Sequence, residues 1–350
     1  MKLFNILFTL FGVVTVIFFL FQILPGDPAR MMMDQNEDVE QLEIIKKKYG
    51  FDEPILNQYL YYLNDLSIIS IHSKNPEKIN FIRENKYSFT KIYDFQNSTL
   101  VLKFPYLRES YQRRGVKVST IIMDTFPNTV VLAISSILFA TVFGLLLGIL
   151  SALYKETLFD NSIQLFSTFG MSMPSFLSSI IFAWIFGFVL ADITGLNMTG
   201  SLFELDDFGD EYRLELKNLI LPSIVLGIRP IAVISMMMRN SLIETLKKNY
   251  VITAYAKGLS KSKVILNHCL KNSLNPVITA LSGWFASLLA GSVFVEYIFG
   301  WNGLGREIVN SLNLLDVPVI IGAVIVVSFS FIMINIFVDY TYKFLDPRIS

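Results

Sequence analysis

Few residues in this chain are of the types that carry out acid–base or nucleophilic chemistry. The 350 residues include two histidines, His72 and His268, and one cysteine, Cys269. Neither histidine lies in a long apolar segment, so a membrane-buried nucleophile with a neighbouring base is not predicted. A single cysteine cannot form an internal disulfide or a cysteine-based zinc site. We therefore expect no catalytic, cofactor-binding or metal-binding residues, and we do not expect an enzyme.

Three residues in or beside apolar segments could instead contact a polar solute. Arg229 lies next to Pro230 inside an apolar segment, where a charged group is costly unless it faces water or other helices. Glu296 and Trp301 lie at the end of another apolar segment, near Arg306. Arg229, Glu296 and Trp301 are therefore candidate pore or gate residues. A hydrogen bond or ion pair that stabilises the gate is the alternative for Glu296.

One stretch combines many lysines with no acidic residue. Residues 245–275 contain six lysines and neither Asp nor Glu. Asn249 is expected to cap a short helix that Gly258 ends, and Ser260 is expected to start a second helix leading to Pro276. Such a segment would lie across one face of the membrane.

The first of these short helices has residues suited to a groove on a soluble partner. Tyr250 and Tyr255 offer aromatic side chains, Ala254 permits close approach, and Lys257 supplies charge. An ordinary positively charged loop is the alternative, because charge alone does not identify a docking surface.

The composition indicates that these residues belong to a membrane protein. The chain is 53% hydrophobic and 17% charged, with mean hydropathy +0.52, whereas soluble domains carry about 25% charged residues. Its net charge of zero gives no reason to expect nucleic acid as a partner. Gly144 and Gly148 are spaced for close helix contact. Six apolar segments are long enough to cross a ~30 Å hydrocarbon core: 3–24, 126–154, 162–190, 219–243, 276–299 and 317–344.

Lysine and arginine in short loops predict the orientation. The lysine-rich segment 245–275 is expected on the cytoplasmic side, and the acid-rich link between the third and fourth spans outside. Six spans then place both termini in the cytoplasm. The predicted fold is an all-α polytopic membrane protein with six transmembrane helices and a small extracytoplasmic subdomain of mixed structure between spans 1 and 2.

The predicted domain boundaries follow from these spans. The first transmembrane helix takes residues 1–24, the extracytoplasmic subdomain 25–125, the five-helix core 126–344 and the cytoplasmic tail 345–350. Within the subdomain, short helices are expected at 37–48 and 54–65, and the run 99–104 has β character. Either a structural cap over the pore or a dock for a partner would fit this subdomain.

The lysine-rich segment resembles the coupling loop of binding-protein-dependent ABC import permeases, in the form found in the peptide/nickel permease family. That form is Tyr-x-x-Thr-Ala-x-Ala-Lys-Gly-Leu, followed by His-x-x-x-Asn-x-x-x-Pro. The matching residues are Tyr250, Thr253, Ala254, Ala256, Lys257, Gly258, Leu259, His268, Asn272 and Pro276. The glutamate that opens the general signature is absent, and Ile252 occupies its place, as is common in the peptide branch.

Further motifs extend the resemblance along nearly the whole chain in the family's order. They are Leu-Pro-Gly-Asp-Pro-Ala at 24–29, Pro-Asn-Thr at 127–129, Met-Pro-Ser-Phe at 173–176, Leu-Ile-Leu-Pro at 219–222, Glu-x-x-Phe-Gly-Trp-x-Gly-Leu-Gly at 296–305 and Leu-Asp-Pro-Arg at 345–348. The element at 24–29 is similar to that of the B-type permease of the pair. Residues 67–107 depart from the pattern as an insertion.

The resemblance implies a type I ABC importer permease of the dipeptide/oligopeptide/nickel family in the bacterial cytoplasmic (inner) membrane. It implies a heterodimer with a second homologous permease, two cytoplasmic ABC ATPases, an extracytoplasmic solute-binding protein and surrounding membrane lipid. ATP and magnesium would bind to the partner ATPases, and no Gly-x-x-x-x-Gly-Lys-Ser/Thr loop occurs here. The resemblance assigns ATPase coupling to Tyr250, Thr253, Ala254, Tyr255, Ala256, Lys257, Gly258 and Leu259.

Three questions stay open on the sequence. The cargo is expected to be a di- or oligopeptide, with a nickel chelate, glutathione or a sugar as alternatives. An ion-coupled secondary transporter is an alternative mechanism, although few buried charges and no inverted repeat support it. A non-transporting sensor scaffold with the same fold is a further alternative.

Overall fold

The computed structural model describes residues 2–23, 27–33, 39–76, 78–82, 86–206 and 208–345. It divides into two units, residues 1–124 with 308–328 and residues 125–307 with 329–350. Half of the predicted motif at 24–29, namely residues 24–26, lies outside the described residues, as does the predicted tail from 346 onward.

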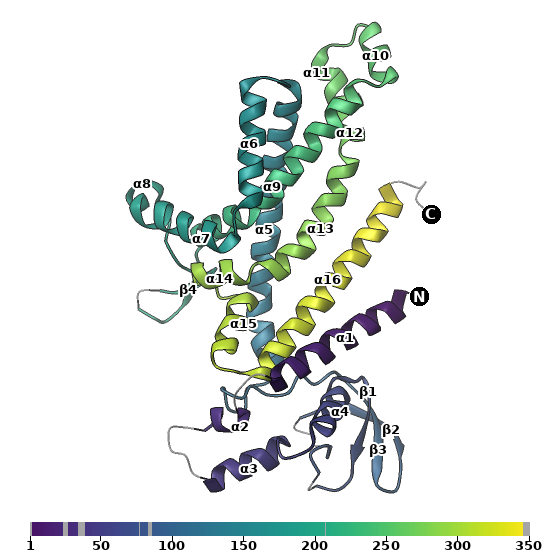
Figure 1. The fold of residues 1–350 in the computed structure, drawn as a ribbon, viewed down its shortest axis with the longest axis vertical. Helices are drawn as coiled ribbons and strands as arrows, with labels where there is room; N and C mark the ends of the chain where they lie inside the picture. Colours follow the sequence, from purple (N-terminus) through teal and green to yellow (C-terminus); the bar gives the residue numbers. More distant parts are fainter. Residues whose placement is uncertain are drawn as a thin grey trace. The chain divides into compact units, whose positions relative to one another are not determined.

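The first unit combines an apolar helix with a small mixed subdomain (Figure 1). Its strands form an antiparallel sheet in the order β1-β3-β2, in which Ile71 pairs with Leu100. The predicted helices at 37–48 and 54–65 and the predicted strand at 99–104 are all found. The elements are α1 (Lys2–Ile23), α2 (Pro28–Met31), α3 (Val39–Tyr49), α4 (Ile55–Leu66), β1 (Ile69–Ser73), β2 (Phe89–Asp94) and β3 (Ser98–Lys103).

Aromatic residues of α4 form the core of this unit. Tyr59 and Tyr62 are buried against Val14 and Phe18 of α1. The hydroxyl groups of Tyr59 and Thr15 are 2.6 Å apart and hydrogen-bonded. Apolar packing of this kind explains why an amphipathic helix of 12 residues, too short to be stable alone, is held in place.

The second unit is almost entirely helical. Its elements are α5 (Val118–Leu153), α6 (Leu158–Ser172), α7 (Ser175–Trp184), the π-helical turn η1 (Ile185–Val189), α8 (Ala191–Thr194), the β4–β5 hairpin (Phe203–Leu205 and Tyr212–Leu214), α9 (Lys217–Leu246), α10 (Asn249–Ala256), α11 (Lys261–Val264), η2 (Ile265–Cys269), α12 (Leu270–Ser273), α13 (Asn275–Gly291), α14 (Val293–Phe299), α15 (Leu304–Asn313) and α16 (Val317–Leu345). Helices α5, α15 and α16 contribute residues to both units.

Among the described residues, four helices are long and apolar enough to cross a membrane, or up to six spans if each of two bent helix pairs counts as one. The four are α1, α5, α9 and α16. The predicted third span is not one continuous helix, because α6 and α7 meet at 109°. Pro174 lies at this break, in the N-cap position of α7. Proline has no backbone N–H, so it cannot continue the hydrogen bonding of α6. The second pair bends by 49° between Ser273 and Asn275.

The predicted contact at Gly144 and Gly148 is found between α5 and α9. A Cβ atom at Gly144 would lie 2.8 Å from Ile234, and one at Gly148 would lie 2.6 Å from the carbonyl oxygen of Ser235. Helix α6 packs beside α9 in the same group (Figure 1). Close backbone approach of this kind is a common way for helices to associate in lipid.

Candidate functional site

Helix α10 begins and ends close to the predicted positions. Its N-cap is Lys248, with no side-chain capping bond, so the prediction that Asn249 caps the helix is wrong by one residue. Gly258 ends the helix with φ +78°, a conformation that side-chain-bearing residues rarely adopt. Ser260 is the N-cap of α11, as predicted, and α13 begins at Asn275–Pro276.

The two faces of α10 have different surroundings. Val251 and Ala254, three positions apart, are buried in a core that includes Leu242 of α9 and Cys269 of η2. The expectation that Ala254 gives a partner close approach is therefore wrong, because this side chain contacts the chain's own core. Leu259 is half-buried against the same core.

The opposite face of α10 is exposed and aromatic. Tyr250 is 40% exposed and Tyr255 41% exposed. We call this surface the α10 face; its residues are Tyr250, Ile252, Thr253, Tyr255, Ala256 and Lys257. The side-chain amide of Asn272 donates to the Tyr250 hydroxyl at 2.8 Å and so ties the α10 face to α12.

A buried ion pair, which the sequence motifs do not reveal, joins the helices beneath this region. Asp160 of α6 has no exposed surface and binds Arg239 of α9 through two hydrogen bonds, Nε to Oδ1 at 2.7 Å and Nη2 to Oδ2 at 2.6 Å. Ser151 of α5 also donates to this carboxylate, as does the Gln164 amide at 3.1 Å. One carboxylate thus holds α5, α6 and α9 together by charge-assisted bonds.

A weak signal for this pair exists in the sequence. Thr157 caps α6 and accepts the backbone N–H of Asp160 at 3.3 Å, which is the geometry of a helix start with an acid in the first turn. Asp160 could have been found as a helix-start residue. Its partner could not, because Arg239 is 79 positions away.

Glu296 and Trp301 lie inside the chain rather than along a solute path. Neither has exposed surface. The Glu296 carboxylate accepts hydrogen bonds from Ser292 Oγ at 2.7 Å and from the backbone N–H of Gly305 at 2.7 Å. The indole N–H of Trp301 donates to the Asn128 carbonyl at 3.0 Å. Glu296 fits the alternative of a stabilising hydrogen bond, and a gate role for these two residues stays a prediction.

Gly303 and Gly305 explain how a carboxylate fits so closely against the backbone here. A Cβ atom at Gly303 would lie 2.4 Å from Glu296 Oε2, and one at Gly305 would lie 2.6 Å from Val293 Cα. Arg306 does not pair with Glu296 through its side chain; its guanidinium donates to the Gly300 carbonyl at 2.8 Å.

Arg229 lies at the break between α6 and α7. Its Nε and Nη2 both donate to the carbonyl oxygen of Met173, at 3.2 and 3.0 Å. The guanidinium borders a cavity of about 60 Å³ that is lined by residues of α6, α7, α9 and α13. Because Arg229 borders this cavity, it is the candidate contact for a solute.

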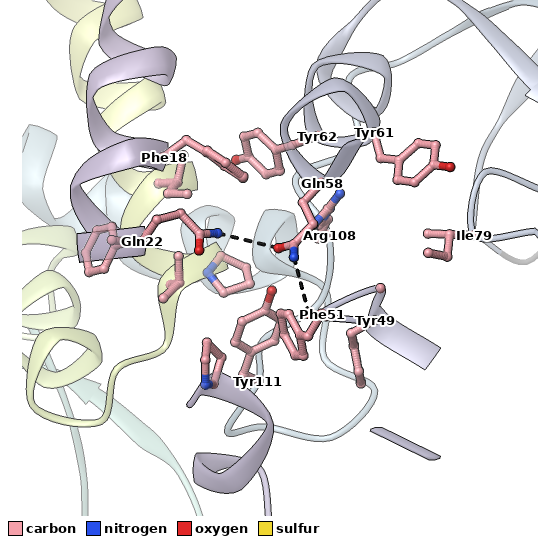
Figure 2. A pocket seen from close by; sticks show the side chains of 16 residues that line it. Phe18, Gln22, Tyr49, Phe51, Gln58, Tyr61, Tyr62, Ile79, Arg108 and Tyr111 are labelled. Carbon is pink, nitrogen blue, oxygen red and sulfur yellow. Dashed lines mark hydrogen bonds between the residues drawn. The ribbon is translucent and has the colours of Figure 1, made fainter. Parts of the chain in front are cut away.

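A second cavity, of about 80 Å³, lies within the first unit (Figure 2). Seven of the 16 residues that line it are aromatic, among them Phe18, Tyr62 and Tyr111. Arg108, with its guanidinium 4.9 Å from the Tyr62 ring centroid, reaches this cavity but is already paired with Asp65 at 2.8 Å. The cavity therefore does not offer an unpaired charge.

Two family descriptions match most of the chain. Residues 144–350 match the family described as "Binding-protein-dependent transport system inner membrane component". Residues 1–81 match the N-terminal family of the same transport systems.

Individual relatives span nearly the full length. The chain is 32% identical to the di/tripeptide transport system permease protein DppB of Pseudomonas aeruginosa, over 97% of this chain and 95% of that protein. It is 30% identical to the glutathione transport system permease protein GsiC of Escherichia coli K12, over 99% and 97%.

The fold has a counterpart among solved structures. An inward-facing structure of the MetNI methionine ABC transporter aligns with a TM-score of 0.53 at 14% identity, over 65% of this chain and 97% of that one. At this identity the likeness concerns the fold alone. The family matches and the full-length relatives together show that the chain belongs to the binding-protein-dependent transport system inner membrane components, as a permease subunit of an ABC importer of the dipeptide/oligopeptide type.

Proposed function

We propose that this permease moves a peptide or a similarly small solute across the bacterial cytoplasmic membrane by alternating access. The relatives named for di/tripeptide and glutathione transport support a peptide-like solute. Two ATPase subunits, a second homologous permease and an external solute-binding protein complete the assembly. Because the relatives are permeases of ABC systems, an ion-coupled transporter or a sensor scaffold fits this chain less well.

The observation that carries the coupling proposal is the exposed α10 face on a buried base. Val251 and Ala254 anchor α10 in the chain's core, so a force on the α10 face reaches α9 and η2 without loss in a flexible loop. We propose that the ATPases bind the α10 face, with Tyr255 and Tyr250 as aromatic contacts and Lys257 as the basic contact. Gly258 sets the helix end. Closure of the ATPases would then switch the bundle between two packed states.

The proposed topology places the α10 face in the cytoplasm and the first-unit sheet outside, with six spans and both termini inside. The lysine-rich, acid-free segment 245–275 supports this orientation. The sheet subdomain would form a cap or a docking surface on the outer side.

The test is a Tyr255→Ala variant in the importer reconstituted in proteoliposomes. Tyr255 is 41% exposed. Loss of a central aromatic contact at an interface lowers affinity by about 2 kcal/mol or more, so we expect ATP-driven uptake to fall roughly tenfold or further. Less ATPase should also copurify with the permease.

A matched control is Tyr212→Ala on β5, which is 72% exposed on the opposite side in the proposed topology. It should leave both readouts unchanged. Wild-type uptake and ATPase recovery in Tyr255→Ala would count against coupling through the α10 face. Ala254 is a poor probe, because a bulky residue there would disrupt the chain's own core.

A further inference from the structure

Arg229 is a charged residue with unused hydrogen-bonding capacity in the middle of a membrane-spanning helix. It lies near the centre of α9, a helix of 30 residues. A guanidinium has five N–H donors, and Arg229 directs two of its N–H groups to one acceptor, the carbonyl oxygen of Met173. Within the described ranges, no Asp or Glu forms an ion pair with this side chain. No acid in the described part of the chain therefore neutralises its charge.

Such a charge needs water or an anion to be tolerated at this depth. The Asp160–Arg239 pair shows the difference, because there the carboxylate takes two N–H groups of the arginine. Arg229 has the same side chain in the same helix but meets only a neutral carbonyl. The remaining N–H groups have no partner among the described residues, and the guanidinium borders the cavity between α6, α7, α9 and α13.

The cavity wall has polar and apolar parts. Ser175 and Ser178 of α7 bring hydroxyl groups, while Trp284 and Leu288 of α13 bring an aromatic ring and an aliphatic chain. Because of the 109° bend, the first backbone N–H groups of α7 also lie beside this cavity. They favour an anion as well, but the main attraction comes from Arg229. At about 60 Å³ the cavity holds a few water-sized groups. It could therefore take one end of a small solute rather than all of it.

We propose that Arg229 binds a carboxylate of the transported solute during its passage. The side chain that the solute carries next to this carboxylate would lie against Trp284. This inference rests on the proposed function and narrows its substrate class to solutes that carry a free carboxylate. Met173 O orients the guanidinium, and the carboxylate takes the N–H groups that the chain leaves free, in the bidentate geometry that arginine favours.

The experiment compares uptake of dialanine with that of its C-terminal amide in proteoliposomes that contain the whole importer. Both solutes are supplied at concentrations that saturate the external binding protein. For each variant, the ratio of acid to amide uptake is divided by the wild-type ratio, so that the preference of the binding protein cancels. For Arg229→Gln we expect this double ratio to fall about tenfold, because a charge-assisted hydrogen bond is lost only for the acid.

Arg229→Lys keeps the positive charge but lacks the paired N–H donors of a guanidinium, so its double ratio should fall less than that of Arg229→Gln. If the Arg229→Gln permease does not assemble, the same comparison is made with Arg229→Lys. The matched control is Arg306→Gln, since Arg306 also donates to a backbone carbonyl, that of Gly300, but does not border the cavity. Its double ratio should stay near one.

Equal losses for acid and amide in Arg229→Gln would overturn the inference, because Arg229 would then only hold the bent helix pair. Unchanged uptake of both solutes would overturn it as well. If the wild-type importer takes up neither solute with ATP, the proposed peptide function fails, and this inference fails with it. That outcome is distinct, because it appears in the wild type before any variant is compared.

Discussion

Two acidic side chains of this permease make contacts that their residue types and sequence positions do not predict. Glu296, an acid at the end of an apolar segment, is a buried hydrogen-bond acceptor, whereas Asp160, which no motif includes, ties three helices together. Both observations depend on contacts across the bundle. A sequence shows the charge of a residue but not the partner that neutralises it.

The Asp160–Arg239 pair gives a prediction at this scale. Asp160→Asn keeps the shape but removes the charge from bonds of 2.6 and 2.7 Å, so we expect a loss of about 1.5 to 3 kcal/mol in stability. The loss should appear as a lower midpoint of thermal unfolding in detergent. A double-mutant cycle with Arg239→Gln should show strong coupling.

The exposed acid Asp192, changed to Asn, serves as the control and should leave the midpoint unchanged. Additive effects of Asp160→Asn and Arg239→Gln in the cycle would mean that the two side chains act independently.

The sequence predicted which helices and strands form better than it predicted the angles between them or the faces that they bury. The end of α10 at Gly258, the strand at β3 and the close approach at Gly144 follow from local conformation and small side chains, and all are found. Pro174 explains why α6 ends where it does, but the 109° angle between α6 and α7 depends on what packs on either side. Which face of α10 is buried was also beyond local reasoning, since apolar residues lie on both faces and the neighbouring helices decide.

The stability of the sheet in the first unit should depend on pH because of one buried lysine. Lys103 on β3 is buried, and its ammonium donates to the Asp65 carbonyl. Burial lowers the pKa of Lys103 to about 8, although the nearby Asp65 carboxylate acts in the opposite direction. Between about pH 8 and the ordinary lysine value of about 10.4, the unfolded sheet binds one more proton than the folded sheet. Its stability should therefore rise with pH in this window.

Hydrogen exchange of the β1 and β3 amides in the full-length chain measures this effect. Dividing the wild-type rate by the Lys103→Met rate at each pH cancels the intrinsic pH dependence of exchange. We expect wild-type protection, relative to the variant, to increase by up to about tenfold per pH unit in the window. A constant ratio would show that Lys103 does not change its charge on folding.

For the whole molecule, the sequence specified the family and most of the membrane segments. The order of weak motifs along the chain and the six apolar runs were visible without a structure, because hydrophobic length is set by the bilayer. The sequence offered three candidate residues for contact with the solute, and the structure favours one of them, Arg229. Of the candidate residues Arg229, Glu296 and Trp301, the last two are buried, and a linear pattern cannot distinguish a buried residue from one that lines a pore.

The distribution of charge between two loops predicts how the whole molecule is oriented in the membrane. The segment 245–275 has six lysines and no acid, whereas the link that holds β4 and β5 is rich in Asp and Glu. Because positively charged loops stay on the cytoplasmic side, the two segments should lie on opposite sides of the membrane. The α10 face can meet an ATPase only if it lies inside.

The single native cysteine makes this orientation directly measurable. Cys269 is buried, and Cys269→Ser gives a cysteine-free background. In that background, a membrane-impermeant maleimide should label Tyr212→Cys and Leu60→Cys in right-side-out vesicles, and Thr253→Cys only in inside-out vesicles. Tyr212 and Leu60 are 72% and 52% exposed, so burial would not explain a failure to react. Labelling of Thr253→Cys from the outside would remove the basis for ATPase coupling through α10, because ATP is hydrolysed in the cytoplasm.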